Sequence, residues 1–270
     1  MEINRLVVII TLVMTTAVFF SAIKDSRQRS SLPDFSAYDD VKQKKAAFFA
    51  FMLPLVSAQN AEIQVQRQRL EELKHLSEEE YSRSHRRFLE GLAEYYRLDV
   101  ERVTPIEVQQ LLKRVDEVPA SLALAQAAME SAWGTSRFAT EANNLFGQWC
   151  YVEGCGLVPL QRAAGSKHEV AKFDSAADAV ASYLRNINTH YAYQDLRNRR
   201  AELRQTDSPV SGHLLAEDLI NYSELRDAYV KEIQAVIRIN KLAQYDVIQD
   251  AAQCLSSVSI ADNSLLSINA

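Results

Sequence analysis

The chain has 270 residues, of which 47% are hydrophobic and 24% are charged, and its net charge is -5. This length is enough for one substantial core, or for one core and a smaller helical module. The seven glycines and six prolines are too few for many tight strand connections, so we expect a mainly α fold. The acidic balance, without a dense Lys/Arg stripe, argues against nucleic acid as a partner.

An apolar stretch without charges runs from Leu6 to Ala22 near the N-terminus. About 17 residues are the lower limit for a membrane-spanning helix and slightly long for the core of a signal peptide. We therefore expect residues 1–23 to be an inner-membrane anchor or a cleaved signal, and either one places the remaining chain in the periplasm. The polar residues 24–40 are expected to form a linker.

Residues 41–115 are expected to form a helical region. The apolar run Ala46–Val56 is too short to span a membrane and contains Pro54, so it should pack as a core helix or lie on a surface. Capping and periodicity predict further helices, one opened by a Ser77–Glu80 capping box and one with a proline at its first position. These helices are predicted over 58–76, 78–97 and 105–115.

An alanine-rich helix follows, predicted to begin at Pro119 and to end at Gly134. From residue 118 to residue 136 the only ionisable side chain is Glu130. A helix that is apolar nearly all round is buried, so this carboxyl group should face the core or a cleft. On a helical wheel its neighbours are Gln126 and Trp133.

Burial of Glu130 without a nearby cation should raise its pKa, as a general acid requires. The alternative is that Glu130 pairs with an arginine from elsewhere in the chain, such as Arg137 or Arg185. The spacing alone does not separate these interpretations, because perturbed acids also occur in structural ion-pair networks.

Glycines punctuate residues 143–173, which therefore are the one place where strands are expected, as a small hairpin or two. Within it, Cys150 and Cys155 are close enough to form a disulfide in an oxidising compartment. A zinc site is the less favoured alternative, because only His168 lies nearby. Helix is predicted to return after Ser175 and again over about 224–243, followed by a flexible tail, 247–270.

The segment AQAAMESAWGTSRFATEANNLFG, residues 125–147, resembles the N-acetylglucosaminidase family of bacterial cell-wall hydrolases, which includes the muramidase-like domain of flagellar FlgJ proteins. The family's Glu-Ser-x-Trp-Gly element corresponds to residues 130–134, and its Asn-Asn-Leu-Phe-Gly element corresponds to residues 143–147. The resemblance extends over about residues 116–246. Near its end, Tyr222 and Tyr229 match the two tyrosines of a further family segment.

This resemblance implies a lysozyme-like fold, in which a helical domain and a small β-hairpin lobe border a glycan cleft. It implies that Glu130 is the general acid that cleaves the β-1,4 bond after N-acetylglucosamine in peptidoglycan, without a cofactor or metal. Glycan strands would then be the partner. The residues expected to bind them are Gln126, Trp133, Asn144, Phe146 and Tyr222.

The sequence departs from the family where a second carboxylate is expected on the hairpin, because Gln161 stands at the aligned position. Glu153, Glu169 and Asp174 are nearby, and Glu169 is the preferred substitute. Two carboxyl groups about 5 Å apart would support retention, and a gap of about 6.5 to 9.5 Å would support inversion. With one acid, the acetamido group of the substrate could act as nucleophile. A lytic transglycosylase and a non-catalytic wall-binding protein are the alternative functions.

Overall fold

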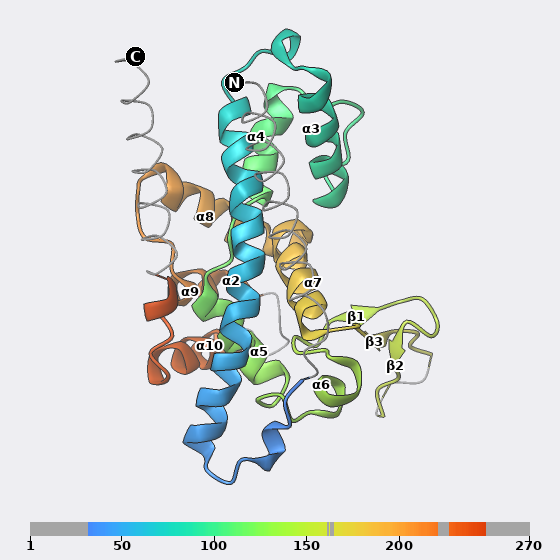
Figure 1. Cartoon of the computed structure of the whole chain (residues 1–270), viewed down its shortest axis with the longest axis vertical. Coiled ribbons are helices and arrows are strands. Elements are labelled where there is room, and N and C mark those ends of the chain that lie inside the picture. The colour runs from blue at the N-terminus through green and yellow to red at the C-terminus, as the bar shows by residue number, and fades with distance from the viewer. Residues whose placement is uncertain (1–31, 161, 163–164, 221–226, 247–270) are drawn as a thin grey trace, which may run out of the picture.

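The computed structural model describes residues 32–160, 162, 165–220 and 227–246. The predicted anchor or signal, residues 24–31 of the linker, the tail, Gln161 and Tyr222 lie outside these residues. The described part is mainly helical with one small sheet (Figure 1), as the sequence predicts. Its helices, with short 3-10 turns marked η, are η1 (Phe35–Ala37), α2 (Val41–Leu73), η2 (Glu78–Glu80), α3 (Arg83–Tyr95), α4 (Pro105–Arg114), α5 (Ala120–Glu130), α6 (Arg137–Ala142), α7 (Ala176–Thr189), η3 (Tyr191–Tyr193), α8 (Gln194–Gln205), α9 (Gly212–Leu215), η4 (Ala216–Leu219) and α10 (Asp227–Ile239).

Helix α2 is the long central helix of Figure 1, and it packs against both α5 and α7. The prediction of separate elements over 46–56 and 58–76 is wrong, because one helix continues through Pro54. A proline removes one backbone hydrogen bond, and here burial of the apolar face of α2 compensates for that loss. By length and composition alone α2 could cross a membrane. The buried side chains Phe48, Met52 and Val56 instead show that it is a core helix.

The predicted helix starts are largely confirmed. The Ser77–Glu80 capping box is present, but it opens only the short turn η2, and α3 begins later at Arg83. Helix α4 begins at Pro105 behind the cap Thr104, and the Ser175 hydroxyl caps α7 by accepting from the backbone N–H of Asp178. Helices α6, α8 and α9 are not predicted by the sequence patterns.

The helical region and the following residues share one hydrophobic core. A buried ion-pair network also joins them, because the carboxylate of Asp116 lies 3.4 Å from Arg67 of α2, 3.5 Å from Arg200 of α8 and 3.1 Å from Arg204 of α8. These three guanidinium groups hold the pKa of Asp116 below its usual range despite burial of the carboxyl group. The long helix α2 is therefore part of the same folded body as α5.

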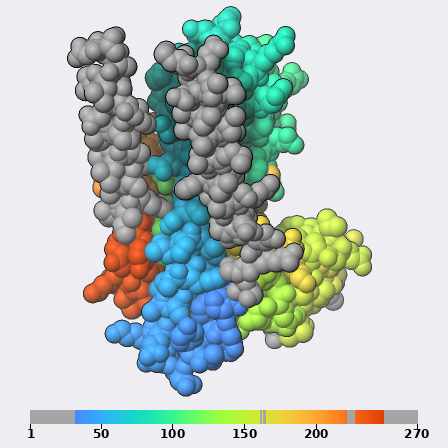
Figure 2. All heavy atoms as spheres, in the orientation of Figure 1, coloured from blue at the N-terminus to red at the C-terminus, as the bar shows by residue number. Residues whose placement is uncertain are grey.

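A small antiparallel sheet forms a lobe that projects from the helical body beside α6 and α7 (Figure 1). Its strand order is β1 (Trp149–Cys150), β3 (Glu169–Ala171), β2 (Gly156–Leu157). In Figure 2 this lobe stands out from the body in yellow-green. A disulfide joins Cys150 to Cys155 across the turn, with their Cα atoms 6.2 Å apart. The strands and the bridge lie where the sequence predicts them.

Candidate active site

Glu130 is the last residue of α5, a helix whose residues from Ala120 to Ala128 are all buried. The predicted end at Gly134 is wrong, since the chain leaves the helix after Glu130. Ala132, Trp133 and Gly134 follow with φ angles of 51°, 61° and 78°. The helical wheel therefore does not apply to Trp133, because it assumes helical geometry beyond the last helical residue.

The turn after Glu130 is strained, because non-glycine residues in the left-handed region cost roughly 1–3 kcal/mol each. The hydroxyl of Ser131 closes the turn locally. It donates to the carbonyl of Ala127 at 2.6 Å and accepts from the backbone N–H of Gly134 at 2.8 Å. One hydroxyl does not suffice to offset two such residues, so packing from outside the turn must contribute.

That packing comes from the N-terminal part of the described chain. The indole of Trp133 meets the rings of Phe48 and Phe49 edge to face, with centroids 5.9 and 5.4 Å apart, and the ammonium of Lys45 lies 4.5 Å from its centroid. A side chain on Gly134 would place its Cβ only 2.4 Å from the ring of Phe35. We refer to Phe35, Phe48 and Phe49 as the aromatic clamp.

A chain of hydrogen bonds holds the carboxyl group of Glu130. The hydroxyl of Tyr229, from α10, donates to Oε1 of Glu130 at 2.9 Å. The amide of Gln126 donates to that hydroxyl at 3.0 Å, and its oxygen accepts from the hydroxyl of Tyr183 at 2.5 Å. Such buried networks fix the orientation of their members. Three helices, α5, α7 and α10, thus position one carboxyl group.

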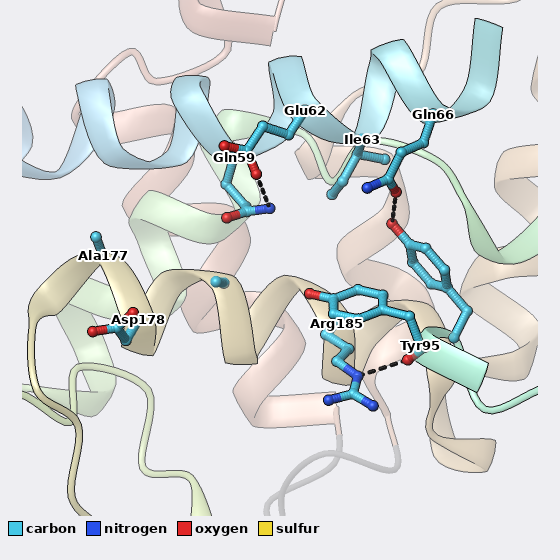
Figure 3. A pocket seen from close by; sticks show the side chains of 10 residues that line it. Gln59, Glu62, Ile63, Gln66, Tyr95, Ala177, Asp178 and Arg185 are labelled. Carbon is cyan, nitrogen blue, oxygen red and sulfur yellow. Dashed lines mark hydrogen bonds between the residues drawn. The ribbon is translucent and has the colours of Figure 1, made fainter. Parts of the chain in front are cut away.

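Burial raises the pKa of Glu130, and the hydrogen bond from Tyr229 opposes that rise. The predicted alternative, an ion pair with Arg137 or Arg185, does not form. Arg137 pairs with Glu141, and Arg185 lies under the ring of Tyr95 and donates to its backbone carbonyl at 2.7 Å (Figure 3). The direction of the pKa shift is the one expected for a general acid.

The pocket of Figure 3 lies at the seam of α2, α3 and α7 and has a volume of about 260 Å³. Its lining includes Gln59, Glu62 and Arg185, but neither Glu130 nor Tyr229. This pocket is therefore separate from the carboxyl group of Glu130. The candidate site is identified by the hydrogen bonds and the raised pKa of Glu130, and not by the pocket.

The Asn-Asn-Leu-Phe-Gly loop, residues 143–147, also lies against Glu130. The amide of Asn144 donates to the carbonyls of Gln148 and Ala171 at 2.9 and 2.8 Å, which ties the loop to the sheet. Gly147 has a φ of 63°, and a Cβ on it would lie 3.3 Å from Oε2 of Glu130. Glycine is thus favoured both by the backbone conformation and by the closeness of the carboxyl group.

The residues predicted to bind substrate have several locations. Gln126, Asn144 and Phe146 are buried; the first two are used in internal hydrogen bonds, and Phe146 stacks on Tyr183 with centroids 4.0 Å apart. Trp133 is partly buried against the clamp. These four side chains support the site, and their direct contact with glycan stays a prediction, as does that of Tyr222.

Glu169 lies in the central strand of the lobe. Its two carboxylate oxygens accept the backbone N–H groups of Gly154 at 3.1 Å and Gly156 at 2.8 Å, which lowers its pKa. It also lies beside Cys150 and Cys155, whose disulfide leaves no thiolate for a metal ion. Glu169 therefore fixes the turn of the lobe, and its role as second catalytic carboxylate stays a prediction.

The sequence patterns miss two parts of this site. The first part is the contact between Tyr229 and Glu130. Tyr229 matches a tyrosine of the family segment, and that match is the one signal in the sequence that could have indicated this contact. The aromatic clamp lies more than eighty residues before the turn that it contacts, so no local pattern indicates the pairing.

The comparisons with known proteins agree with the resemblance seen in the motifs. The model of the glucosaminidase family, described as mannosyl-glycoprotein endo-beta-N-acetylglucosaminidase, matches residues 107–242. Protein bax of Escherichia coli (strain K12) is 33% identical over 219 residues, which cover 81% of this chain and 77% of that protein. No solved structure matches significantly. With half of the chain matched by the family model, the chain belongs to the glucosaminidase family.

Proposed function

We propose that the chain is a peptidoglycan hydrolase that cleaves the β-1,4 glycosidic bond after N-acetylglucosamine, with Glu130 as general acid. The observation that carries this proposal is the single carboxyl group at the end of a buried apolar helix, with a raised pKa and a hydroxyl donor on one oxygen. The family supports a glycosidase acting on a glycan.

The two carboxyl oxygens of Glu130 would have different roles in the reaction. Oε1 accepts the hydroxyl of Tyr229, which leaves Oε2, beside Gly147, to carry the acidic proton. During cleavage this proton passes to the glycosidic oxygen of the leaving sugar, and the bond to the anomeric carbon breaks. Burial raises the pKa of Tyr229 far above its usual range, so its hydroxyl stays protonated as a donor.

The group that attacks or stabilises the anomeric carbon defines the rest of the mechanism. We propose Glu169 first, and the acetamido group of the substrate as the alternative. Because both oxygens of Glu169 already accept backbone N–H groups, Glu169→Gln would also disturb the turn. Its activity should therefore be compared with that of Cys150→Ser, which loosens the same turn and leaves the carboxylate in place. A much larger loss for Glu169→Gln would support a catalytic carboxylate.

We also propose that the protein acts in the periplasm, held by residues 1–23 as a membrane anchor or exported by them as a signal. The disulfide between Cys150 and Cys155 supports an oxidising compartment. Fractionation of cells that produce the full chain, with a tagged C-terminus, would test this location.

The test of the activity compares the wild type with Glu130→Gln on purified sacculi. We expect Glu130→Gln to stay folded and to release no reducing ends, whereas Glu90→Gln, at an exposed acid of α3, should behave as the wild type. Full activity of Glu130→Gln would refute the proposal. Mass spectrometry of the products separates hydrolysis from lytic transglycosylase action, which leaves anhydro-muramic ends. Binding of sacculi without any release would indicate a wall-binding protein.

A further inference from the structure

Exposed apolar side chains gather on the small lobe. Each of them is at least 47% exposed, although most large apolar side chains of the described residues are buried. Exposed apolar surface concentrated in one place usually marks a binding site. The side chains are Trp149, Tyr151, Val152, Val158 and Leu160.

Trp149 and His168 form a stacked pair of rings at the surface of the lobe, which we refer to as the platform. Trp149 is 57% exposed, and its indole stacks on the ring of His168 with centroids 4.3 Å apart and planes 16° from parallel. Trp149 is paired with Val170, and His168 precedes Val170 by two residues, so both rings lie on the same face of the sheet. The imidazole covers one face of the indole, and Trp149 nevertheless stays more than half exposed.

The platform lies close to Glu130. A Cβ on Gly147 would be 3.3 Å from Oε2 of Glu130, and two residues of chain span at most about 7 Å. The Cα atom of Trp149 is therefore within roughly 12 Å of the acid, given these two steps and one Cα–Cβ bond. A short oligosaccharide bound at Glu130 can reach that far.

We propose that Trp149, backed by His168, is a sugar-stacking subsite that binds a pyranose ring of the glycan strand next to Glu130. The inference rests on the proposed function and specifies one contact of that site. The faces of a pyranose ring carry C–H groups with a partial positive charge, and these are attracted to the negative face of an indole. A rigid aromatic ring loses little conformational entropy on binding, so support from His168 favours affinity. A glycan is the favoured occupant because Trp149 lies two residues after Gly147, which adjoins the carboxyl group of Glu130.

The experiment uses a soluble N-acetylglucosamine oligomer as probe and Glu130→Gln as the uncleaving protein. The two tryptophans of the chain are Trp133 and Trp149, so fluorescence titration reports on the platform while Trp133 stays within the clamp. In the Glu130→Gln background we expect Trp149→Ala to bind about tenfold more weakly, and Trp149→Phe to bind within about threefold. Calorimetry gives these affinities without relying on fluorescence. Tyr191→Ala, at a tyrosine of η3 that is 81% exposed, is the matched control and should not change affinity.

In the otherwise unaltered enzyme, Trp149→Ala should raise KM on glycan with kcat nearly unchanged, because stacking binds the substrate and the transition state alike. Unchanged oligomer affinity in Trp149→Ala would overturn the inference and leave the patch to a protein partner. Binding that depends on Trp149 without any cleavage by the wild type would support the subsite and refute the hydrolase. Cleavage with an unchanged KM in Trp149→Ala would refute the subsite alone.

Discussion

Replacing Phe48 with leucine should loosen the strained turn after Glu130. Phe48 is fully buried, and its ring lies edge to face against Phe35 at 5.3 Å and against Trp133 at 5.9 Å. Leucine keeps most of the volume, so the repacking costs less than about 1.5 kcal/mol. Each lost aromatic pair adds about 0.5–1.5 kcal/mol. The free energy of unfolding should therefore fall by roughly 1–4 kcal/mol, as these two terms combine.

This loss is comparable to the strain that the clamp must offset. Ala132 and Trp133 in the left-handed region cost roughly 1–3 kcal/mol each. Domains of ordinary stability unfold with about 5–15 kcal/mol, so Phe48→Leu should remain folded overall. The turn itself, however, should relax in a sizeable fraction of molecules, which moves Glu130 away from Tyr229. We expect the release of reducing ends from sacculi to fall about tenfold, which corresponds to about 1.4 kcal/mol.

The assay combines urea unfolding, activity on sacculi and the fluorescence of Trp133. With Trp149→Phe as background, Trp133 is the single tryptophan, and its emission should shift to longer wavelength in Phe48→Leu as water reaches the indole. The control is Leu70→Ala, at a buried residue near the other end of α2. It should cost 2–5 kcal/mol without changing the emission of Trp133 or the activity of folded protein.

Two outcomes would refute this reasoning. If Leu70→Ala and Phe48→Leu lose activity in proportion to their loss of stability, Phe48 acts only through general stability. If Phe48→Leu leaves the emission and the activity unchanged, the clamp does not hold the turn.

Further predictions concern the same region. Gly134→Ala should lower the free energy of unfolding, measured in urea titrations, by about 1–3 kcal/mol or more. The new methyl group would meet the ring of Phe35, and the φ of 78° at this position disfavours alanine. Tyr229→Phe removes the hydrogen bond that lowers the pKa of Glu130, so the basic limb of the pH–rate profile should move to higher pH, whereas Tyr96→Phe should not move it. Because burial raises the folded-state pKa of Glu130, the wild type loses stability as pH rises from the unfolded-state pKa through the folded-state pKa. The difference in melting temperature between Glu130→Gln and the wild type should therefore move in favour of Glu130→Gln as the pH rises above the ordinary pKa of a glutamate.

The acid itself could be predicted from the sequence, because one charge in an apolar helix indicates a buried carboxyl group whatever the surrounding fold. The location of Trp133 could not be predicted. A helical wheel assumes that the helix continues, but Ser131 ends the helix with its hydroxyl, and Phe48 stabilises the turn from a distant part of the chain. The strain of this turn is therefore offset by contacts between residues far apart in the sequence, which an analysis of neighbouring residues cannot detect.

Helix α8 is missed for a different physical reason. Its sequence, QDLRNRRAELRQ, has no apolar stripe, and stripes are what helical periodicity detects. Arg200 nevertheless is fully buried, because it donates to the backbone carbonyl of Glu117 at 2.8 Å and pairs with Asp116. From the sequence alone, an arginine that is buried against carbonyl groups and a carboxylate cannot be distinguished from an arginine that is exposed to solvent. The position of α8 thus depends on tertiary contacts alone.

The contacts around the candidate site extend beyond the part of the chain that the family model covers. The family model begins at residue 107, whereas the clamp that holds the turn after Glu130 lies between residues 35 and 49. The similarity to Protein bax of Escherichia coli also extends over 219 residues, well beyond the 136 residues from 107 to 242. A fragment limited to residues 107–242 would keep the acid but lose the aromatic rings that hold its turn. The smallest unit in which Glu130 keeps this geometry therefore includes η1 and α2.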